Sequence, residues 1–333
     1  MTMILADPPA AARLDPRETH HRIPGPHAGL GLFLRHLPPA DGAPAHGRAV
    51  IYVHGGTFSS ALSVAHRFDG RSWRDELCDA GFHVWALDFH GFGAFSDPWP
   101  ELADAADTHP PLGRTADASR QLEAAARFIA ARHGTGRVSL IAHSWGCMVA
   151  GHFAGRCPEL VDRMVFFGPI ARRDAGTDAP LLPAWRLISI EDQRTRFTAD
   201  VPAGEPPVLA ARHFAEWAEA YLDSDPASRT RTPPAVKVPA GAFQDIFDAW
   251  AGTFAYDPTL VRAPVAIIRG AWDSMCIDAD ATWLLAALSG AADRRDVVIP
   301  RATHLTHLEA GRAVLYHATE TFLRGGDPAG FAA

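Results

Sequence analysis

Apolar runs that end in glycine or polar residues recur along the chain. Residues 48 to 54, RAVIYVH, are β-branched and apolar and are followed by Gly-Gly-Thr. Such a run is typical of a buried strand that ends in a tight turn. The same pattern recurs in FHVWALDFHGFG (82–93), RVSLIAHS (137–144), VDRMVFFGP (161–169), APVAIIRGAWD (263–273) and RDVVIPRATH (295–304). We therefore expect six buried strands.

Helical stretches separate these runs. In the clearest one, residues 115–134, apolar side chains recur every three or four positions before a closing glycine: Ala118, Leu122, Ala125 and Ile129, then Gly134. Strands that alternate with helices predict an α/β fold with a mostly parallel, doubly wound sheet that is covered on both faces. In such sheets the active groups collect at the carboxyl ends of the strands.

The alternation stops between about residues 171 and 258. This segment is rich in proline, and its clearest periodic parts are helical, so we expect a mainly helical cap inserted into a core formed by residues 1–170 and 259–333. Its aromatic residues have spacings that are typical of a helical core, but together they predict an apolar cavity: Trp185, Phe214, Trp217, Phe243, Phe247 and Trp250.

One serine lies where a predicted strand gives way to a run of small residues. Residues 142 to 146 read Ala-His-Ser-Trp-Gly. This is similar to the nucleophile elbow G-x-S-x-G, in which small residues two positions on either side allow a sharp turn that exposes the hydroxyl. Ala142 replaces the first glycine. Serine is also a common helix N-cap, so Ser144 alone has two interpretations.

A nucleophilic serine needs a base within hydrogen-bond reach and a carboxylate that orients the base. Asp273 ends the strand segment IIRGAWD, and His304 lies in IPRATHLTHLE after the next strand, which gives the order Ser, Asp, His. Other residues compete for these roles: His307 for the base, and Asp174, Asp278 and Asp280 for the acid.

From about residue 20 to 325 the chain resembles the α/β-hydrolase superfamily. The matching segments are HGG (54–56), DFHGFG (88–93) followed by Ser96, the serine elbow, RGAWD and HLTHLE. The resemblance implies Ser144 as nucleophile, Asp273 as orienting acid and His304 as general base. Thr303 stands where the family usually has glycine.

The resemblance also implies where the developing oxyanion would bind. Its donors would be the backbone N–H groups of Gly56 and Trp145, and Thr57 would replace Gly56 if the loop is set differently. Trp145, Trp272 and Met275 flank the expected catalytic residues and are candidates for the cavity wall.

These features predict a cofactor-independent serine hydrolase that cleaves a carboxylic ester of a small or medium apolar compound through an acyl-enzyme. The serine argues against epoxide hydrolases and haloalkane dehalogenases, which have aspartate at the elbow. Lactonase, thioesterase, amidase, carbon–carbon bond hydrolase and haloperoxidase activities stay open. The segment HSWG (143–146) is similar to a motif of proline iminopeptidases. The glycine-rich HGGPG motif of those enzymes is missing, because residues 54–58 read HGGTF. A non-catalytic module that binds a small ligand is the alternative from another class.

Composition excludes several other classes. The chain is 47% hydrophobic and 21% charged, with a net charge of −7 and no block of like charges, which argues against nucleic-acid or anionic membrane partners. We expect no metal, because HExxH is absent, and no nucleotide cofactor, because neither GxGxxG nor GxxxxGK[ST] follows a strand. The oligomeric state is not indicated.

The N-terminus and the cysteines bear on location. Residues 1–15 have no basic region followed by a long apolar segment, so we expect a cytoplasmic protein. The cysteines lack metal-ligand or disulfide-framework spacing, and we expect them to be reduced and buried: Cys78, Cys147, Cys157 and Cys276.

Overall fold

The computed structural model describes residues 13–44, 46–174, 176 and 178–328. Its centre is an eight-stranded sheet in the order β1-β2-β4-β3-β5-β6-β9-β10. Residues 1–12, which carry most of the N-terminal segment considered above, lie outside the described part. The strands are β1 (Thr19–Pro24), β2 (Gly31–Leu37), β3 (Ala49–Val53), β4 (His83–Asp88), β5 (Val138–His143), β6 (Val161–Phe167), β9 (Val265–Gly270) and β10 (Arg294–Ile299).

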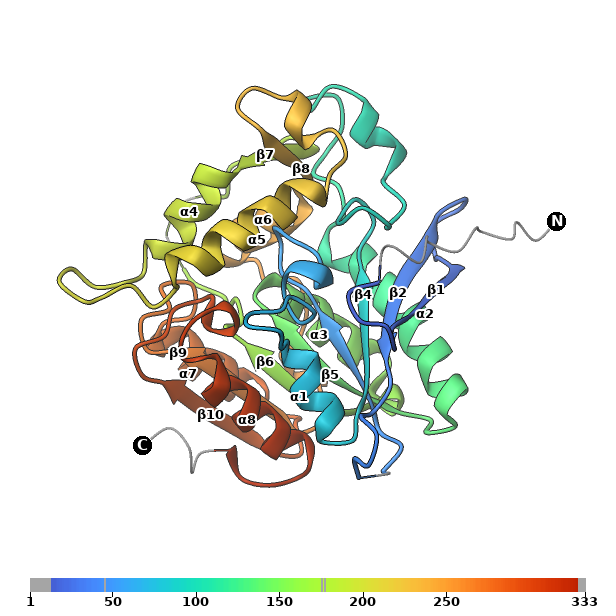
Figure 1. Ribbon diagram of the computed structural model, residues 1–333. Coiled ribbons are helices and arrows are strands. Elements are labelled where there is room, and N and C mark those ends of the chain that lie inside the picture. The colour runs from blue at the N-terminus through green and yellow to red at the C-terminus, as the bar shows by residue number, and fades with distance from the viewer. Residues whose placement is uncertain (1–12, 45, 175, 177, 329–333) are drawn as a thin grey trace.

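The six predicted strands are present and run parallel to one another, which confirms the predicted fold class. The sheet also has two strands that the apolar pattern did not indicate. β1 and β2 form an antiparallel pair, and β2 joins β4 antiparallel at the edge of the sheet (Figure 1). Their sequences, THHRIP and GLFLRHL, are interrupted by histidine and arginine, so neither reads as a continuous apolar run.

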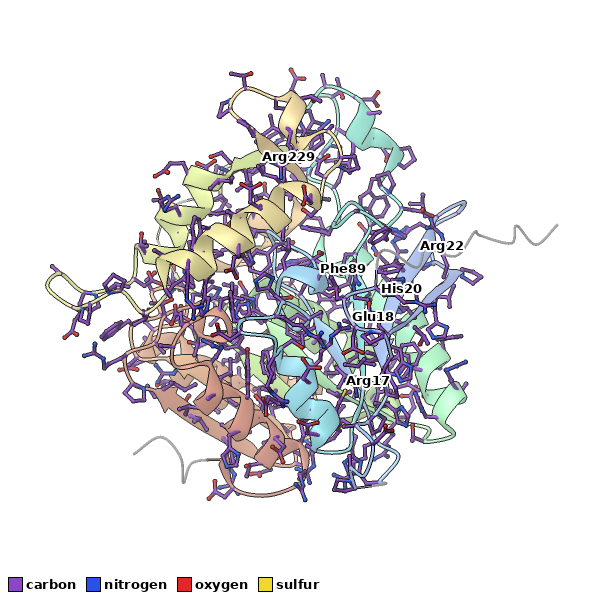
Figure 2. The ribbon with its side chains drawn as sticks, viewed as in Figure 1. Arg17, Glu18, His20, Arg22, Phe89 and Arg229 are labelled. Carbon is purple, nitrogen blue, oxygen red and sulfur yellow. The ribbon has the colours of Figure 1, made fainter. Side chains whose placement is uncertain are left out.

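Ion pairs explain how charged residues are accommodated beside this edge. Glu18 is fully buried and bonds Arg35 and Arg74 at 2.7 Å each and His20 at 2.6 Å. Figure 2 shows Glu18 and His20 at the start of β1. Burial raises the pKa of Glu18, but His20 and the two guanidinium groups outweigh this effect and lower the pKa to about 2. The carboxylate therefore stays charged and paired.

Helices cover both faces of the sheet. α1 (Trp73–Asp79) and α8 (Arg312–Leu323) pack on one face, and α2 (Thr115–His133), α3 (Trp145–Arg156) and α7 (Asp278–Ala287) contribute to the core on the other. The predicted helix over 115–134 is confirmed, and Gly134 ends it in the left-handed conformation with φ 64°. Short 3₁₀ turns occur at Ser60–Leu62, Pro100–Ala103, Pro158–Leu160, Ser228–Thr230, Pro258–Leu260 and Thr306–Leu308.

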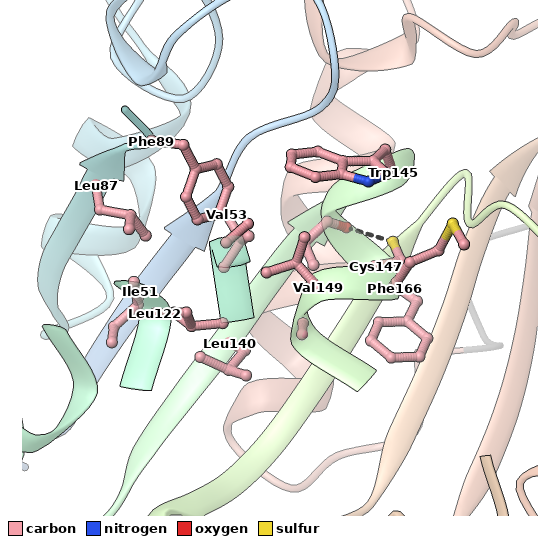
Figure 3. Close-up of a cluster of buried hydrophobic side chains, with 14 of the residues drawn as sticks. Ile51, Val53, Leu87, Phe89, Leu122, Leu140, Trp145, Cys147, Val149 and Phe166 are labelled. Atoms are coloured by element: carbon pink, nitrogen blue, oxygen red, sulfur yellow. Dashed lines mark hydrogen bonds between the residues drawn. The ribbon is translucent and has the colours of Figure 1, made fainter. Parts of the chain in front are cut away.

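The largest apolar core lies between the sheet and the α2–α3 pair. Val53 and Leu140 from the sheet meet Leu122 of α2 and Val149 of α3, and all four are fully buried (Figure 3). Burying a side chain of this size stabilises the fold by about 1.5 to 3 kcal/mol. This core fixes the position at which β5 passes into α3.

The chain between β6 and β9 forms a separate layer at one end of the sheet (Figure 1). It contains α4 (Ile190–Thr198), α5 (Ala211–Asp223) and α6 (Gly241–Trp250). It is less purely helical than expected, because β7 (Trp185–Ser189) and β8 (Ala235–Pro239) pair antiparallel. Proline at the end of β8 and the polar, exposed positions of β7 obscured this pair in the sequence.

None of the helices within the described ranges combines the length and the apolarity that crossing a bilayer requires.

Candidate active site

Ser144 occupies a sharp turn between β5 and α3. Its φ of 57° and ψ of −126° lie in a region that side chains other than glycine rarely adopt. Its backbone N–H donates to the carbonyl of Phe167 at 2.9 Å, which ties the turn to the neighbouring strand β6. The Ser144 side chain makes no capping hydrogen bond to α3. The geometry therefore favours the elbow interpretation over the N-cap interpretation.

The small residues around Ser144 are explained by close backbone approach. A Cβ on Gly146 would lie 2.5 Å from the carbonyl oxygen of His54 and 2.7 Å from that of Val53, so α3 could not reach this position beside β3. A Cβ on Gly55 would lie 3.3 Å from the Cβ of Ser144. Ala142 is fully buried inside β5, where its methyl group fits.

Asp273 and His304 form a buried pair. Nδ1 of His304 lies 2.9 and 3.0 Å from the two carboxylate oxygens of Asp273, so the ring N–H donates to the carboxylate. The backbone N–H groups of Met275 and Cys276 donate to Asp273 Oδ1 at 2.8 and 3.1 Å. Burial raises the pKa of Asp273, but His304 and the Met275 amide outweigh it, and the net pKa lies below its ordinary value. The carboxylate is therefore ionised and already oriented.

His143 connects the serine turn with the histidine loop. It immediately precedes Ser144, and its Nε2 lies 3.0 Å from the carbonyl oxygen of His304, to which it must donate. Its ring stacks on Phe167 with the ring centroids 4.6 Å apart. Complete burial, followed by the proximity of His307 and His304, holds the pKa of His143 well below its ordinary value. His143 is therefore a neutral donor that fixes the backbone of His304.

The candidate nucleophile and the candidate base lie at one cavity but are not joined by a hydrogen bond. Ser144 and His304 both line the same cavity. Among the hydrogen bonds of the described residues, none joins the Ser144 hydroxyl to the His304 ring. Catalytic hydrogen bonds often tighten only when substrate binds.

Thr303 has a structural use at the position where the resemblance led us to expect glycine. Its backbone N–H donates to Glu309 Oε2 at 3.0 Å, and its hydroxyl donates to Glu309 Oε1. Glu309 is 1% exposed. Burial raises its pKa to about 7, although the Thr303 bonds lower it. The loop that carries His304 is thus held by a buried carboxyl group that the motif did not reveal.

The competing residues are engaged elsewhere. His307 lies in the 3₁₀ turn Thr306–Leu308 and stacks on Phe58, and burial lowers its pKa to about 3. Asp174 is exposed. Asp278 is 92% exposed and pairs with Arg269, whereas Asp280 pairs with Arg173. In the structure Asp273 is the carboxylate that His304 contacts.

The expected oxyanion donors lie beside the serine. Trp145 is the first residue of α3, so its backbone N–H has no acceptor within the helix. Gly56 and Thr57 both line the cavity, which leaves the choice between their N–H groups a prediction. A Cβ on Gly56 would lie 2.9 Å from the Cβ of Ala242 in α6. The absence of a side chain at Gly56 therefore lets α6 approach this loop.

The cavity has a volume of about 370 Å³, within the range of small-ligand sites. Three of the six aromatic residues singled out in the insertion line it: Phe243, Phe247 and Trp250. Met275 also lines it. Phe214 and Trp217 instead pack against Phe197, and Trp185 lies under Lys237. Trp145 is fully buried and Trp272 lies beneath Arg301.

Sequence reasoning missed the polar part of the cavity wall. Arg186, Asp192, Gln193 and Arg196 come from β7 and α4 and line the cavity. No motif marks them, because they lie in a segment whose position over the site depends on the fold.

A buried carboxylate joins the two layers next to Ser144. Asp245 of α6 is 2% exposed, and its Oδ2 accepts hydrogen bonds from the indole Nε1 of Trp145 at 2.9 Å and from the backbone N–H and hydroxyl of Thr115 at 2.6 Å each. Its Oδ1 accepts from Arg114. The N-cap residue of α2 makes no side-chain cap, so Asp245 supplies one from another helix.

One group of residues has metal-ligand character but lies elsewhere. Donor atoms of His36, His83 and His133 lie within 4.8 Å of one another. His83 is at the start of β4 and His133 at the end of α2, so the cluster lies at the opposite end of the strands from the serine turn. Each ring has a protein hydrogen-bond partner: His133 accepts from Trp85 at 2.9 Å, and His36 and His83 lie 3.1 Å apart, nitrogen to nitrogen. Hydrogen bonding accounts for this cluster.

The four cysteines are free thiols and buried, as expected. Burial raises the pKa of Cys147 well above its ordinary value. A thiolate nucleophile at this site is therefore not supported.

Comparison with known proteins places this geometry among related folds. A family model described as the alpha/beta hydrolase fold matches residues 48–311. No curated protein matches the chain. Among solved structures, a thermophilic esterase from Thermogutta terrifontis is 18% identical, with 92% of this chain and 98% of that chain covered and a TM-score of 0.57.

Two further structures show the same likeness. A serine hydrolase from the polyaromatic hydrocarbon-degrading bacterium Cycloclasticus zankles is 17% identical, covers 92% of this chain and 98% of its own, and has a TM-score of 0.56. A probable hydrolytic enzyme from Pseudomonas aeruginosa is 21% identical, covers 92% and 93%, and has a TM-score of 0.58. At these identities the likeness shows the fold alone.

Proposed function

The chain belongs to the α/β-hydrolase family and is a hydrolase, and we propose that it is a cofactor-independent serine hydrolase that cleaves a carboxylic ester of a small or medium, mainly apolar compound. The observation that carries the proposal is the combination of a strained Ser144 and the oriented Asp273–His304 pair at one cavity. We name these three residues as the catalytic triad.

Acylation follows from this arrangement. His304 accepts the hydroxyl proton of Ser144 through Nε2 while Ser144 Oγ bonds to the carbonyl carbon of the ester. Asp273 stabilises the imidazolium that forms, because its carboxylate already accepts the Nδ1–H. His304 then returns the proton to the departing alcohol oxygen, which leaves an acyl group on Ser144.

The negative charge that develops on the carbonyl oxygen requires donors that are already in place. We assign this role to the backbone N–H groups of Trp145 and Gly56. Each such donor contributes about 3 to 4 kcal/mol to stabilisation of the transition state. Water then attacks the acyl-enzyme with His304 as base, and the carboxylic acid is released.

We propose that residues 171–258 act as a cap over this site. Support comes from α4 and α6, which contribute Phe197, Phe243 and Phe247 to the cavity that contains Ser144. These side chains exclude water from the reacting bond and favour an apolar substrate. A cap of this kind makes substrate choice depend on the inserted segment rather than on the triad.

The same triad could cleave a thioester, a lactone, an amide or a carbon–carbon bond. The kcat/KM values on a panel of such substrates would rank these activities against ester cleavage. A binding module without catalysis is the competing class. The ionised, oriented Asp273 weighs against it, because a ligand-binding pocket has no need of a buried carboxylate that holds a histidine.

Replacement of the nucleophile tests the proposal. Ser144→Ala should lose at least about a thousandfold in kcat on an activated 4-nitrophenyl ester while keeping its circular dichroism spectrum. Ser139→Ala is the matched control, since Ser139 is a buried serine in β5, the strand that leads to Ser144, five residues earlier. Wild-type turnover by Ser144→Ala would overturn the proposal.

A further inference from the structure

The cavity wall contains one cationic side chain whose hydrogen-bonding capacity is only partly used. Arg196 of α4 lines the cavity together with Ser144 and His304. Its Nη1 donates to Asp200 at 3.0 Å. Its Nη2 is buried and has no hydrogen-bond partner among the described residues. A buried donor without a partner is costly, so such an atom is expected to meet a ligand or water.

The position of Arg196 relative to the catalytic pair is fixed by a chain of contacts. Asp200, which holds Nη1, also accepts a hydrogen bond from the hydroxyl of Ser274 at 2.5 Å. Ser274 directly follows Asp273. The guanidinium therefore lies on the side of the cavity that the Asp273 loop forms, close enough for its charge to lower the pKa of Asp273.

The remaining charges around the cavity do not satisfy Nη2. Asp192 lines the cavity, but its Oδ2 accepts from Ser189 in a capping box, at 2.8 Å from the backbone N–H and 2.7 Å from the hydroxyl, and neither of its oxygens bonds Arg196. Arg186 is exposed and lies over the ring of Phe243. Gln193 is 2% exposed and is three residues before Arg196, so both side chains lie on one face of α4. The wall thus offers cationic and amide donors within an apolar surround.

We propose that this face of α4 binds a carboxylate on the substrate, with Arg196 as the specificity-determining residue. The inference rests on the proposed esterase function and names its substrate class: an ester whose apolar body also carries a carboxylate. Arginine suits this role, because its planar guanidinium can bond Asp200 on one side and a second carboxylate on the other. The apolar walls contact the body of the substrate, and the low local dielectric strengthens the contact between the charges.

The test uses two pairs of esters that differ in charge. One pair, 4-nitrophenyl hydrogen glutarate and 4-nitrophenyl pentanoate, places the carboxylate on the acyl side. The other, 3-carboxyphenyl butyrate and phenyl butyrate, places it on the leaving group. In at least one pair the wild-type protein should favour the charged member by about tenfold or more in kcat/KM, the effect expected of one charge-assisted hydrogen bond.

Variants separate binding from structure. Arg196→Gln should reduce the ratio of charged to neutral kcat/KM to about 1, and Arg196→Lys should retain part of it because the charge remains. Arg194→Gln is the matched control: Arg194 lies on the same helix, is 55% exposed and pairs with Glu191. It should keep the wild-type ratio.

The outcomes are distinguishable from failure of the proposed function. Equal turnover of both members in both pairs by the wild-type protein would overturn the carboxylate subsite and leave the esterase proposal intact. An unchanged ratio of charged to neutral kcat/KM in Arg196→Gln would also overturn it, because the guanidinium would then contribute equally to the turnover of both esters. If no ester is cleaved and Ser144 cannot be acylated, the esterase proposal itself fails.

Discussion

Removing the charge of Asp245 tests whether the buried link between α6 and the serine turn supports the site. Asp245→Asn keeps the shape of the side chain but replaces one oxygen with an NH₂ group. In the structure both oxygens accept: Oδ2 from Trp145 and Thr115, and Oδ1 from Arg114. Whichever way the amide turns, its NH₂ group faces donors and leaves at least one of them without an acceptor.

The cost can be worked from these contacts. Hydrogen bonds to a charged group contribute about 1.5 to 3 kcal/mol each, and a buried donor left unpaired costs about 1 to 3 kcal/mol. We expect Asp245→Asn to lower the free energy of unfolding by about 3 kcal/mol. Because Trp145 also carries a proposed oxyanion donor, displacement of its indole should lower kcat by about tenfold or more.

The assay pairs chemical denaturation with kcat on a 4-nitrophenyl ester. Asp248→Asn is the control: Asp248 lies on the same helix three residues later and also pairs with Arg114, but it is 23% exposed and the structure gives it no hydrogen bond to Trp145. Its replacement should cost about 0.5 to 1 kcal/mol and leave kcat near the wild-type value. Equal losses of stability and kcat in the two variants would refute the role of the link to Trp145.

Two further predictions concern residues that hold the catalytic loops. The pKa of Glu309 is raised from 4.5 to about 7, so between these pH values the folded protein keeps the proton that the unfolded chain loses. The free energy of unfolding of the wild type, measured relative to Glu309→Gln, should therefore fall by about 3 kcal/mol from pH 4.5 to 7 and then level off. A difference between the two proteins that stays constant over this pH range in chemical denaturation would show that the carboxyl group titrates normally. Gly146→Ala should lose most activity and several kcal/mol of stability, because the new methyl group would lie 2.5 Å from the His54 carbonyl oxygen; full activity, measured with the same ester, would show that α3 can shift.

Much of the fold follows from local patterns in the sequence. The parallel strands are apolar runs because both of their faces are buried, and Gly134 marks the end of α2 through its left-handed conformation. β1 and β2 escaped this reasoning. Their polar residues are stabilised by partners distant in the sequence, such as Arg74 for Glu18, and a pattern of neighbours does not contain those contacts.

The candidate triad is visible in the sequence because each member follows a strand. Parallel strands bring their carboxyl ends together, so Ser144, Asp273 and His304 are expected to converge, and the structure joins the last two by a hydrogen bond. His143 and Glu309 could not be assigned in this way. Their contacts to the histidine loop depend on how two loops pack, and histidine or glutamate at these positions has no signature of its own.

The cavity illustrates the same limit. The aromatic content of the insertion predicted an apolar wall, but half of the aromatic residues that were singled out pack elsewhere, as Trp217 does against Phe197. Arg196 lies in a segment with no recognisable motif. Its place in the cavity that contains Ser144 follows from the packing of α4 against α5 and β7, which spacing in the sequence does not encode.

Reaction of the purified protein with a fluorophosphonate, followed by intact mass measurement and peptide mapping, tests the central claim most directly. The probe requires an activated serine and no knowledge of the substrate. The account predicts one adduct, located on Ser144 and absent from Ser144→Ala, with strongly reduced labelling of Asp273→Asn. A folded wild-type protein that forms no adduct, or that is labelled at another serine, would contradict it.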